Sequence, residues 1–192
     1  MTGQHPQQDD QQGRQLGREP WREAISFAQR AHTGQTRRDG QTPYASHVVR
    51  VMMTVRDTFG CEDGVALAAA ALHDTIEDTP TDYDDLAGAF GAPVADIVAA
   101  LTKNMLLPET PREADYDTRL RAADWRARLI KLADVLDNAA DSGKPRADNK
   151  PRATGKLRHK VERAIALAQP DAADHPETAR AIALVSSLLD PA

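Results

Sequence analysis

The chain has 192 residues, of which 41% are hydrophobic and only 4% aromatic, so one helical domain with a core of alanine and aliphatic side chains suits it. Its 24 basic and 29 acidic residues give a net charge of −5, which argues against a nucleic-acid-binding surface. A single cysteine, Cys61, excludes an internal disulfide, and no apolar stretch suits a signal peptide or a membrane span. We therefore expect a cytoplasmic protein without a nucleic-acid or membrane partner.

The order of polar and apolar segments predicts an all-α domain. Residues 1–18 are rich in glutamine, aspartate and glycine, so we predict a disordered tail before one domain over 19–192. Apolar residues then recur at helical spacing, and no alternating strand pattern is found. The predicted helices span about 20–32, 44–59, 62–78, 83–90, 93–104, 124–140, 156–168 and 176–189. Loops are expected over 35–43, 107–114 and 142–155.

The segment Leu72–Asp78 places titratable side chains directly after a run of apolar ones. In a continuous helix His73 would stack with Glu77, and Asp74 with Asp78, because residues four apart share a face. Carboxylates this close raise one another's pKa unless a cation lies among them, and a divalent metal ion would fill that role. For a histidine–aspartate pair alone, a solvated helix end is the simpler interpretation.

Two further residues could complete a metal site. His47 lies at the start of the second predicted helix, and Asp134 lies in an apolar helical stretch, where a carboxylate needs a partner. Considered singly, His47 is more simply a core histidine, and Asp134 one half of a structural salt bridge with an arginine.

The order of these motifs resembles the HD superfamily of metal-dependent phosphohydrolases, and most closely the hydrolase domain of RelA/SpoT homologues and the small alarmone hydrolases. The resemblance rests on AHTGQTRRDGQTPYASH (31–47), ALHDTIEDT (71–79), ALTKN (100–104) and LIKLADVLDN (129–138). It implies a stand-alone, all-α HD domain with a motif core over 21–141, followed by C-terminal helices over 156–189.

The resemblance also implies roles for individual residues. The metal ligands would be His47, His73, Asp74 and Asp134, with Mn²⁺ the usual ion of the family and another divalent transition metal the alternative. The catalytic pair that takes the proton of the metal-bound water would be Glu77 and Asp78. The substrate-binding residues would be Arg37, Arg38, Tyr44 and Asn138.

Two positions depart from the best-known branch of the family, which reads Ala-Asp-Arg-x-His-Asn after the lysine–leucine pair. Val135 replaces the arginine and Asp137 the histidine, while Asp134 is unchanged. We expect these departures to alter the wall beside the substrate, which puts the identity of the substrate in question more than the chemistry.

The resemblance implies a 3′-pyrophosphohydrolase that acts on guanosine 3′,5′-bis(diphosphate) (ppGpp) and pppGpp, the alarmones of the stringent response, and releases pyrophosphate. One alternative is an HD phosphohydrolase of another nucleotide, such as an adenine alarmone or NADPH. A second is a nucleotide-binding sensor that has lost catalysis, although the intact ligand set and the Glu77–Asp78 pair argue against it. In each case the partner is a small-molecule nucleotide, and the oligomeric state is left open.

Overall fold

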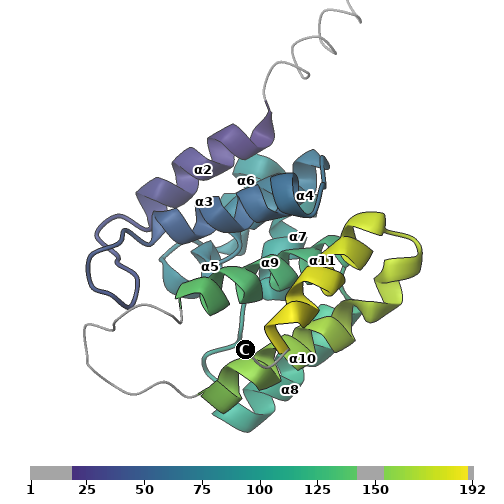
Figure 1. Ribbon diagram of the computed structural model, residues 1–192. Coiled ribbons are helices and arrows are strands. Elements are labelled where there is room, and N and C mark those ends of the chain that lie inside the picture. Colours follow the sequence, from purple (N-terminus) through teal and green to yellow (C-terminus); the bar gives the residue numbers. More distant parts are fainter. Residues whose placement is uncertain (1–18, 142–153, 190–192) are drawn as a thin grey trace, which may run out of the picture.

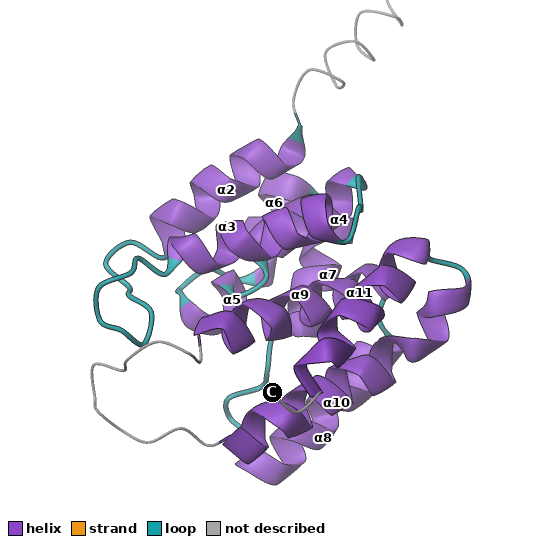
Figure 2. Ribbon diagram, in the orientation of Figure 1, coloured by secondary structure: helices purple, strands orange, loops and turns teal. Residues whose placement is uncertain are grey.

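The computed structural model describes residues 19–141 and 154–189 of the chain, and every element named in these ranges is a helix (Figure 1, Figure 2). Among the described residues the one extended pairing recorded is an isolated bridge between Thr36 and Pro43. The predicted all-α fold is therefore confirmed. The predicted disordered tail over 1–18 and most of the predicted loop over 142–155 lie outside the described residues.

Most helix bounds lie close to those predicted. The elements are α2 (Pro20–Ala31), α3 (Ala45–Met53), the π-helical turn η1 (Thr54–Thr58), α4 (Gly64–Leu72), α5 (Thr75–Asp78), α6 (Tyr83–Phe90), α7 (Ala92–Leu101), α8 (Glu109–Ala122), α9 (Trp125–Asp141), α10 (Thr154–Ala168), the 3-10 turn η2 (Gln169–Ala173), α11 (Pro176–Ser186) and the 3-10 turn η3 (Ser187–Leu189). None of these helices combines the length and the apolar character needed to span a bilayer.

Helix α4 lies in the middle of the hydrophobic core. Its sequence, GVALAAAAL, is apolar on all sides, and every residue from Ala66 to Leu72 is buried. The small alanine side chains allow α2, α3, α7 and α9 to pack around it. The carboxylate of Asp63 starts the helix by accepting the backbone N–H of Ala66 at 2.8 Å. The C-terminal end of α4 is thereby held between α3 and α9, which carry the other candidate metal ligands.

The prediction of one helix over 62–78 is wrong, because α4 ends at Leu72 and α5 begins only at Thr75. Side chains occupy carbonyls that a continuing helix would use. His73 Nδ1 donates to the Ala70 carbonyl at 2.9 Å, and the Thr75 hydroxyl donates to the Leu72 carbonyl at 2.6 Å. Asp74, with φ −103° and ψ −1°, lies in the turn between the two helices. The predicted stacking of His73 with Glu77 and of Asp74 with Asp78 on one continuous helix is therefore wrong.

The prediction of a loop over 107–114 is also wrong, since α8 begins at Glu109. Pro111 lies in the first turn of α8, where a helix makes no use of the backbone N–H that proline lacks. Apolar periodicity does not indicate this helix, because α8 is polar and buries only Tyr116 and Leu120. It packs against α7, α9 and α10.

The C-terminal helices are fixed to the core through Arg128 of α9. Its guanidinium binds both oxygens of Asp171, at 2.6 and 2.8 Å, and donates to the carbonyls of Leu120 and Ala123 at 3.0 and 2.6 Å. Arg128 is only 8% exposed, so these bonds replace the water that it loses on folding. One side chain thus joins η2 to α9 and to the end of α8.

Candidate metal centre and active site

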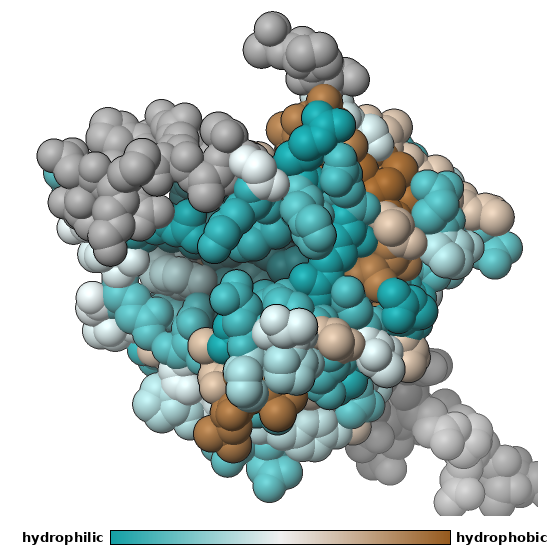
Figure 3. All heavy atoms as spheres, turned by 90° about the horizontal axis from the view of Figure 1, so that it is seen from below, coloured by the Kyte–Doolittle hydropathy of each residue, from teal (hydrophilic) through white to brown (hydrophobic). Residues whose placement is uncertain are grey.

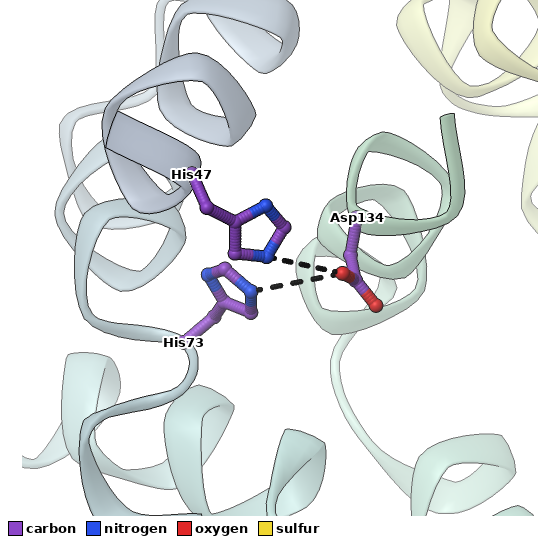
Figure 4. Close-up of side chains that lie close together, drawn as sticks. All are labelled: His47, His73 and Asp134. Atoms are coloured by element: carbon purple, nitrogen blue, oxygen red, sulfur yellow. Dashed lines mark ion pairs between the residues drawn. The ribbon is translucent and has the colours of Figure 1, made fainter. Parts of the chain in front are cut away.

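Three of the predicted metal ligands converge from separate elements (Figure 4). His47 lies in the first turn of α3, His73 in the turn after α4, and Asp134 in the middle of α9. All three are buried, and one ligand atom from each lies within 4.8 Å of the others. The Nε2 atoms of His47 and His73 lie 3.3 and 3.9 Å from Asp134 Oδ1.

Neighbouring groups determine which imidazole nitrogen faces this centre. His47 Nδ1 lies 2.6 Å from an oxygen of Asp137, and His73 Nδ1 lies 2.9 Å from the Ala70 carbonyl. Because both partners are acceptors, Nδ1 carries the proton in each ring. The two Nε2 atoms are buried without a hydrogen-bond partner among the described residues. In a neutral imidazole each offers a lone pair, so the donor set fits a divalent metal ion.

Asp74, the fourth predicted ligand, lies beside the same two rings. Its Oδ2 atom is 3.4 Å from His47 Nε2 and 3.1 Å from His73 Nε2. The Tyr44 hydroxyl donates to the same oxygen at 2.7 Å. Asp74 is not part of the group whose donor atoms all lie within 4.8 Å of one another, which consists of His47, His73 and Asp134. It is therefore close enough to remain a candidate ligand, with its orientation set by Tyr44.

The centre concentrates negative charge that needs a cation or protons to balance it. Burial alone would lower the pKa of His47, but the adjacent carboxylates of Asp134, Asp137 and Asp74 raise it to about 10. Burial would raise the pKa of Asp134, but Lys131 and the two histidines hold that pKa well below its usual range. Among the described residues Asp134 forms a salt bridge with Lys131, at 2.7 Å, and not with an arginine as considered from the sequence. Protonated histidines and a bound dication are thus alternative ways to balance the same carboxylates.

The predicted acidic pair lies on α5 at the edge of this centre. Glu77 Oε2 accepts the backbone N–H of Lys103 at 2.8 Å, and Asp78 Oδ2 accepts the Tyr44 hydroxyl at 2.9 Å. Burial, together with the charges of Asp74 and Asp78, raises the pKa of Glu77 above its ordinary value despite the Lys103 N–H. A carboxyl whose pKa rises toward neutrality becomes a better proton acceptor.

Three of the four predicted substrate-binding residues also come together. Arg37 donates to Asp141 at 3.0 Å and to the side-chain oxygen of Asn138 at 2.8 Å, and its guanidinium lies 5.3 Å from the centre of the Tyr44 ring. The Asn138 amide in turn donates to Asp134 Oδ1 at 2.5 Å. Arg38, the fourth, is exposed on the adjoining loop.

Val135 and Asp137, the two positions that depart from the family pattern, are both buried, and their expected effect on the wall beside the substrate stays a prediction. Val135 is 3% exposed and packs in the hydrophobic core, while Asp137 is 8% exposed and contacts His47. Sequence reasoning missed the contact that Asp137 makes with His47. A signal was present, because Asp137 lies three residues beyond Asp134 and hence on the same side of α9.

A buried centre of two histidines and an aspartate, with a second aspartate from a His-Asp pair, inside an all-helical domain defines a metal-dependent HD domain. The family model described as HD domain matches residues 24–163, and the chain belongs to this family. The resemblance found in the sequence is therefore confirmed.

Curated relatives show which proteins with an HD domain this chain is similar to. The chain is similar to guanosine-3′,5′-bis(diphosphate) 3′-pyrophosphohydrolase MESH1 of Homo sapiens, at 39% identity over 120 residues that cover 62% of this chain and 67% of the relative. The MESH1 protein of Danio rerio is 37% identical with the same coverage. The bifunctional (p)ppGpp synthase/hydrolase SpoT of Escherichia coli (strain K12) is 37% identical over 137 residues, which cover 68% of this chain and 19% of the relative.

A solved structure supports the fold over almost the whole chain. It is described as a metazoan ortholog of SpoT that hydrolyzes ppGpp, and it matches with a TM-score of 0.74 at 24% identity. The match covers 95% of this chain and 96% of that chain. It extends beyond the motif core, so the C-terminal helices share the architecture of that structure.

Proposed function

We propose that this chain is an Mn²⁺-dependent 3′-pyrophosphohydrolase that acts on guanosine 3′,5′-bis(diphosphate) and pppGpp and releases pyrophosphate. The observation that carries the proposal is the pair of buried histidine Nε2 atoms that face Asp134, lie beside Asp74 and have no hydrogen-bond partner in the part of the chain that the structure describes. Support for the substrate comes from the similar MESH1 proteins, whose names state this activity.

The proposed metal ligands are His47, His73, Asp74 and Asp134. Two nitrogen and two oxygen donors suit Mn²⁺ or a related divalent ion. When bound, such an ion supplies a Lewis acid for the phosphate and lowers the pKa of water at the site. The chain holds the two imidazoles in place through the Nδ1 contacts to Asp137 and to the Ala70 carbonyl.

Glu77 is the residue that we propose accepts the proton of the attacking water. One of its oxygens is held by the Lys103 N–H, which leaves the other available to accept a proton. Its raised pKa brings its basicity closer to neutral pH, where a general base is most effective. Asp78, oriented by the Tyr44 hydroxyl, would accept a hydrogen bond from the same water and help to direct it.

The nucleotide would contact Arg37, Arg38, Tyr44 and Asn138. Arg37 is already fixed by Asp141 and Asn138, so little side-chain entropy would be lost when it meets a purine or a phosphate. Arg38 is exposed and would be free to reach a phosphate group. Seen from below, the molecule has a hollow whose visible residues are mostly hydrophilic (Figure 3).

A nucleotide panel tests the proposal. The protein is incubated with Mn²⁺ and with guanosine tetraphosphate, an adenine alarmone or NADPH, and pyrophosphate and orthophosphate are measured separately, with chelated protein as the control. We expect pyrophosphate from the guanosine compound and none after chelation. Orthophosphate from NADPH alone would favour the other-nucleotide alternative. Binding of the alarmone without any turnover would favour the sensor.

A further inference from the structure

Asp137 and Arg50 connect the candidate metal centre with Arg37 on the loop over 35–43. Asp137 Oδ2 accepts a hydrogen bond from His47 Nδ1 at 2.6 Å. The Arg50 guanidinium donates to both oxygens of the same carboxylate, at 2.5 and 2.9 Å. Arg50 also donates to Asp141 Oδ2 at 3.1 Å, and this oxygen accepts Arg37 Nε at 3.0 Å. An unbroken series of charged hydrogen bonds therefore runs from His47 to Arg37.

The series returns to the metal centre by a second route. Arg37 donates to the Asn138 side-chain oxygen at 2.8 Å, and the Asn138 amide donates to Asp134 Oδ1 at 2.5 Å. Arg37 is thus connected to one candidate ligand through Asn138 and to another, His47, through Arg50. The position of Arg37 on the loop over 35–43 and the geometry of the candidate metal centre therefore share one set of contacts.

We propose that Asp137 and Arg50 are positioning residues, which orient His47 for the metal ion and hold Arg37 in place for the nucleotide. The first part requires only a metal site, whereas the second part rests on the proposed function. A carboxylate against Nδ1 fixes the ring so that Nε2 faces the metal, and such partners of metal-bound histidines strongly affect metal affinity.

Arg50 is needed because the Asp137 side chain is 6% exposed, and a buried carboxylate without a cation is costly. The planar guanidinium binds two oxygens of Asp137 and still has an N–H for Asp141, which a lysine ammonium cannot match in geometry. Asp137 stands where the best-known branch of the family has a histidine. A neutral imidazole at that position could not provide two acceptors for Arg50, so Asp137 and Arg50 form a matched pair in this chain.

The first experiment measures Mn²⁺ affinity without nucleotide, by titration of the electron paramagnetic resonance signal of free Mn²⁺. Asp137→Asn keeps the shape and removes the charge, and we expect Mn²⁺ to bind about 10–100-fold more weakly. The matched control is Asp57→Asn, since the Asp57 side chain is 58% exposed and its one ion pair among the described residues is with Arg56, at 3.9 Å. The control should bind Mn²⁺ like the parent.

The second experiment measures binding of GDP to the Mn²⁺-loaded protein by calorimetry. Arg50→Gln releases Asp141 and Arg37, and we expect GDP to bind about 2–30-fold more weakly, the range found for mutations along coupling networks. Arg50→Lys keeps the charge but not the fork, so it should recover only part of the loss, and Arg56→Gln is the control. Because Arg50 is 36% exposed, its variants should fold even if Asp137→Asn does not.

Two results would overturn the inference. The first is that both Asp137→Asn and Arg50→Gln bind Mn²⁺ within twofold of the parent. The second is that Arg50→Gln binds GDP as tightly as the parent does. A parent that binds no divalent ion would overturn it as well. The outcome for the proposed function is separate. If the parent binds Mn²⁺ and GDP and the variants weaken binding as expected, but the parent releases no pyrophosphate from guanosine tetraphosphate, the proposed function is contradicted and the inference stands.

Discussion

Replacement of Glu77 by glutamine separates proton transfer from metal binding. The amide oxygen of glutamine can still accept the Lys103 N–H that holds Glu77 at 2.8 Å, so α5 should keep its place. The other carboxylate oxygen becomes an NH₂ group, which cannot accept a proton. Loss of a general base costs about 10²–10⁴-fold in rate, or roughly 3–5 kcal/mol in the barrier. We expect Glu77→Gln to lose pyrophosphate release by this factor at unchanged Mn²⁺ content.

The same variant should change stability in a pH-dependent way. Because the pKa of Glu77 is raised in the folded protein, the group favours folding below its unfolded pKa, and this contribution is lost as the pH rises through the folded value. Above the folded pKa, the ionised Glu77 is therefore expected to destabilise the metal-free protein. Glu77→Gln should melt at a higher temperature than the parent at neutral pH, and the difference should vanish below about pH 4, near the ordinary glutamate pKa.

Two results would refute this reasoning. Undiminished turnover of Glu77→Gln, measured by pyrophosphate release at saturating substrate, would show that Glu77 is not the base. Loss of Mn²⁺ from the variant, measured by elemental analysis, would show that Glu77 is a ligand instead. The elemental analysis and the melting curve need no substrate, so they remain informative whichever nucleotide the protein hydrolyses.

Three further predictions follow from the described contacts. Saturation with Mn²⁺ at about 100 times its dissociation constant should stabilise the parent by about 2.7 kcal/mol, or roughly 5–10 °C in melting temperature, and Asp134→Ala should melt equally with and without the ion. Arg37→Ala should raise KM by a factor equivalent to about 1.5–3 kcal/mol without loss of Mn²⁺. Arg38→Ala should also raise KM but leave the melting temperature unchanged, because Arg38 is exposed. Arg128→Ala should lower the free energy of unfolding in urea by about 3–5 kcal/mol, because Asp171 loses its bidentate partner, and a change below 1 kcal/mol would contradict this role.

The sequence predicted those parts of the site that lie in short, recognisable segments. His47, His73 and Asp134 belong to three motifs whose order indicated a common centre, and the structure brings their side chains together. The turn at His73 was not predicted, because side chains there compete with the backbone for carbonyl groups and helical periodicity does not register that competition. The pairing of Asp137 with Arg50 was beyond sequence reasoning, since the two residues are 87 positions apart and meet only when α3 packs against α9.

Of the two positions at which this chain departs from the family pattern, we infer that Asp137 bears on metal binding through its contact with His47. Val135 is buried in the hydrophobic core, with 3% of its surface exposed. Asp137 is occupied by His47 and Arg50, so its effect on a nucleotide could pass only through those contacts. The residues that would meet the nucleotide directly, Arg37 and Asn138, match the family and lie together. The two departures therefore give no reason to prefer another nucleotide over a guanosine alarmone.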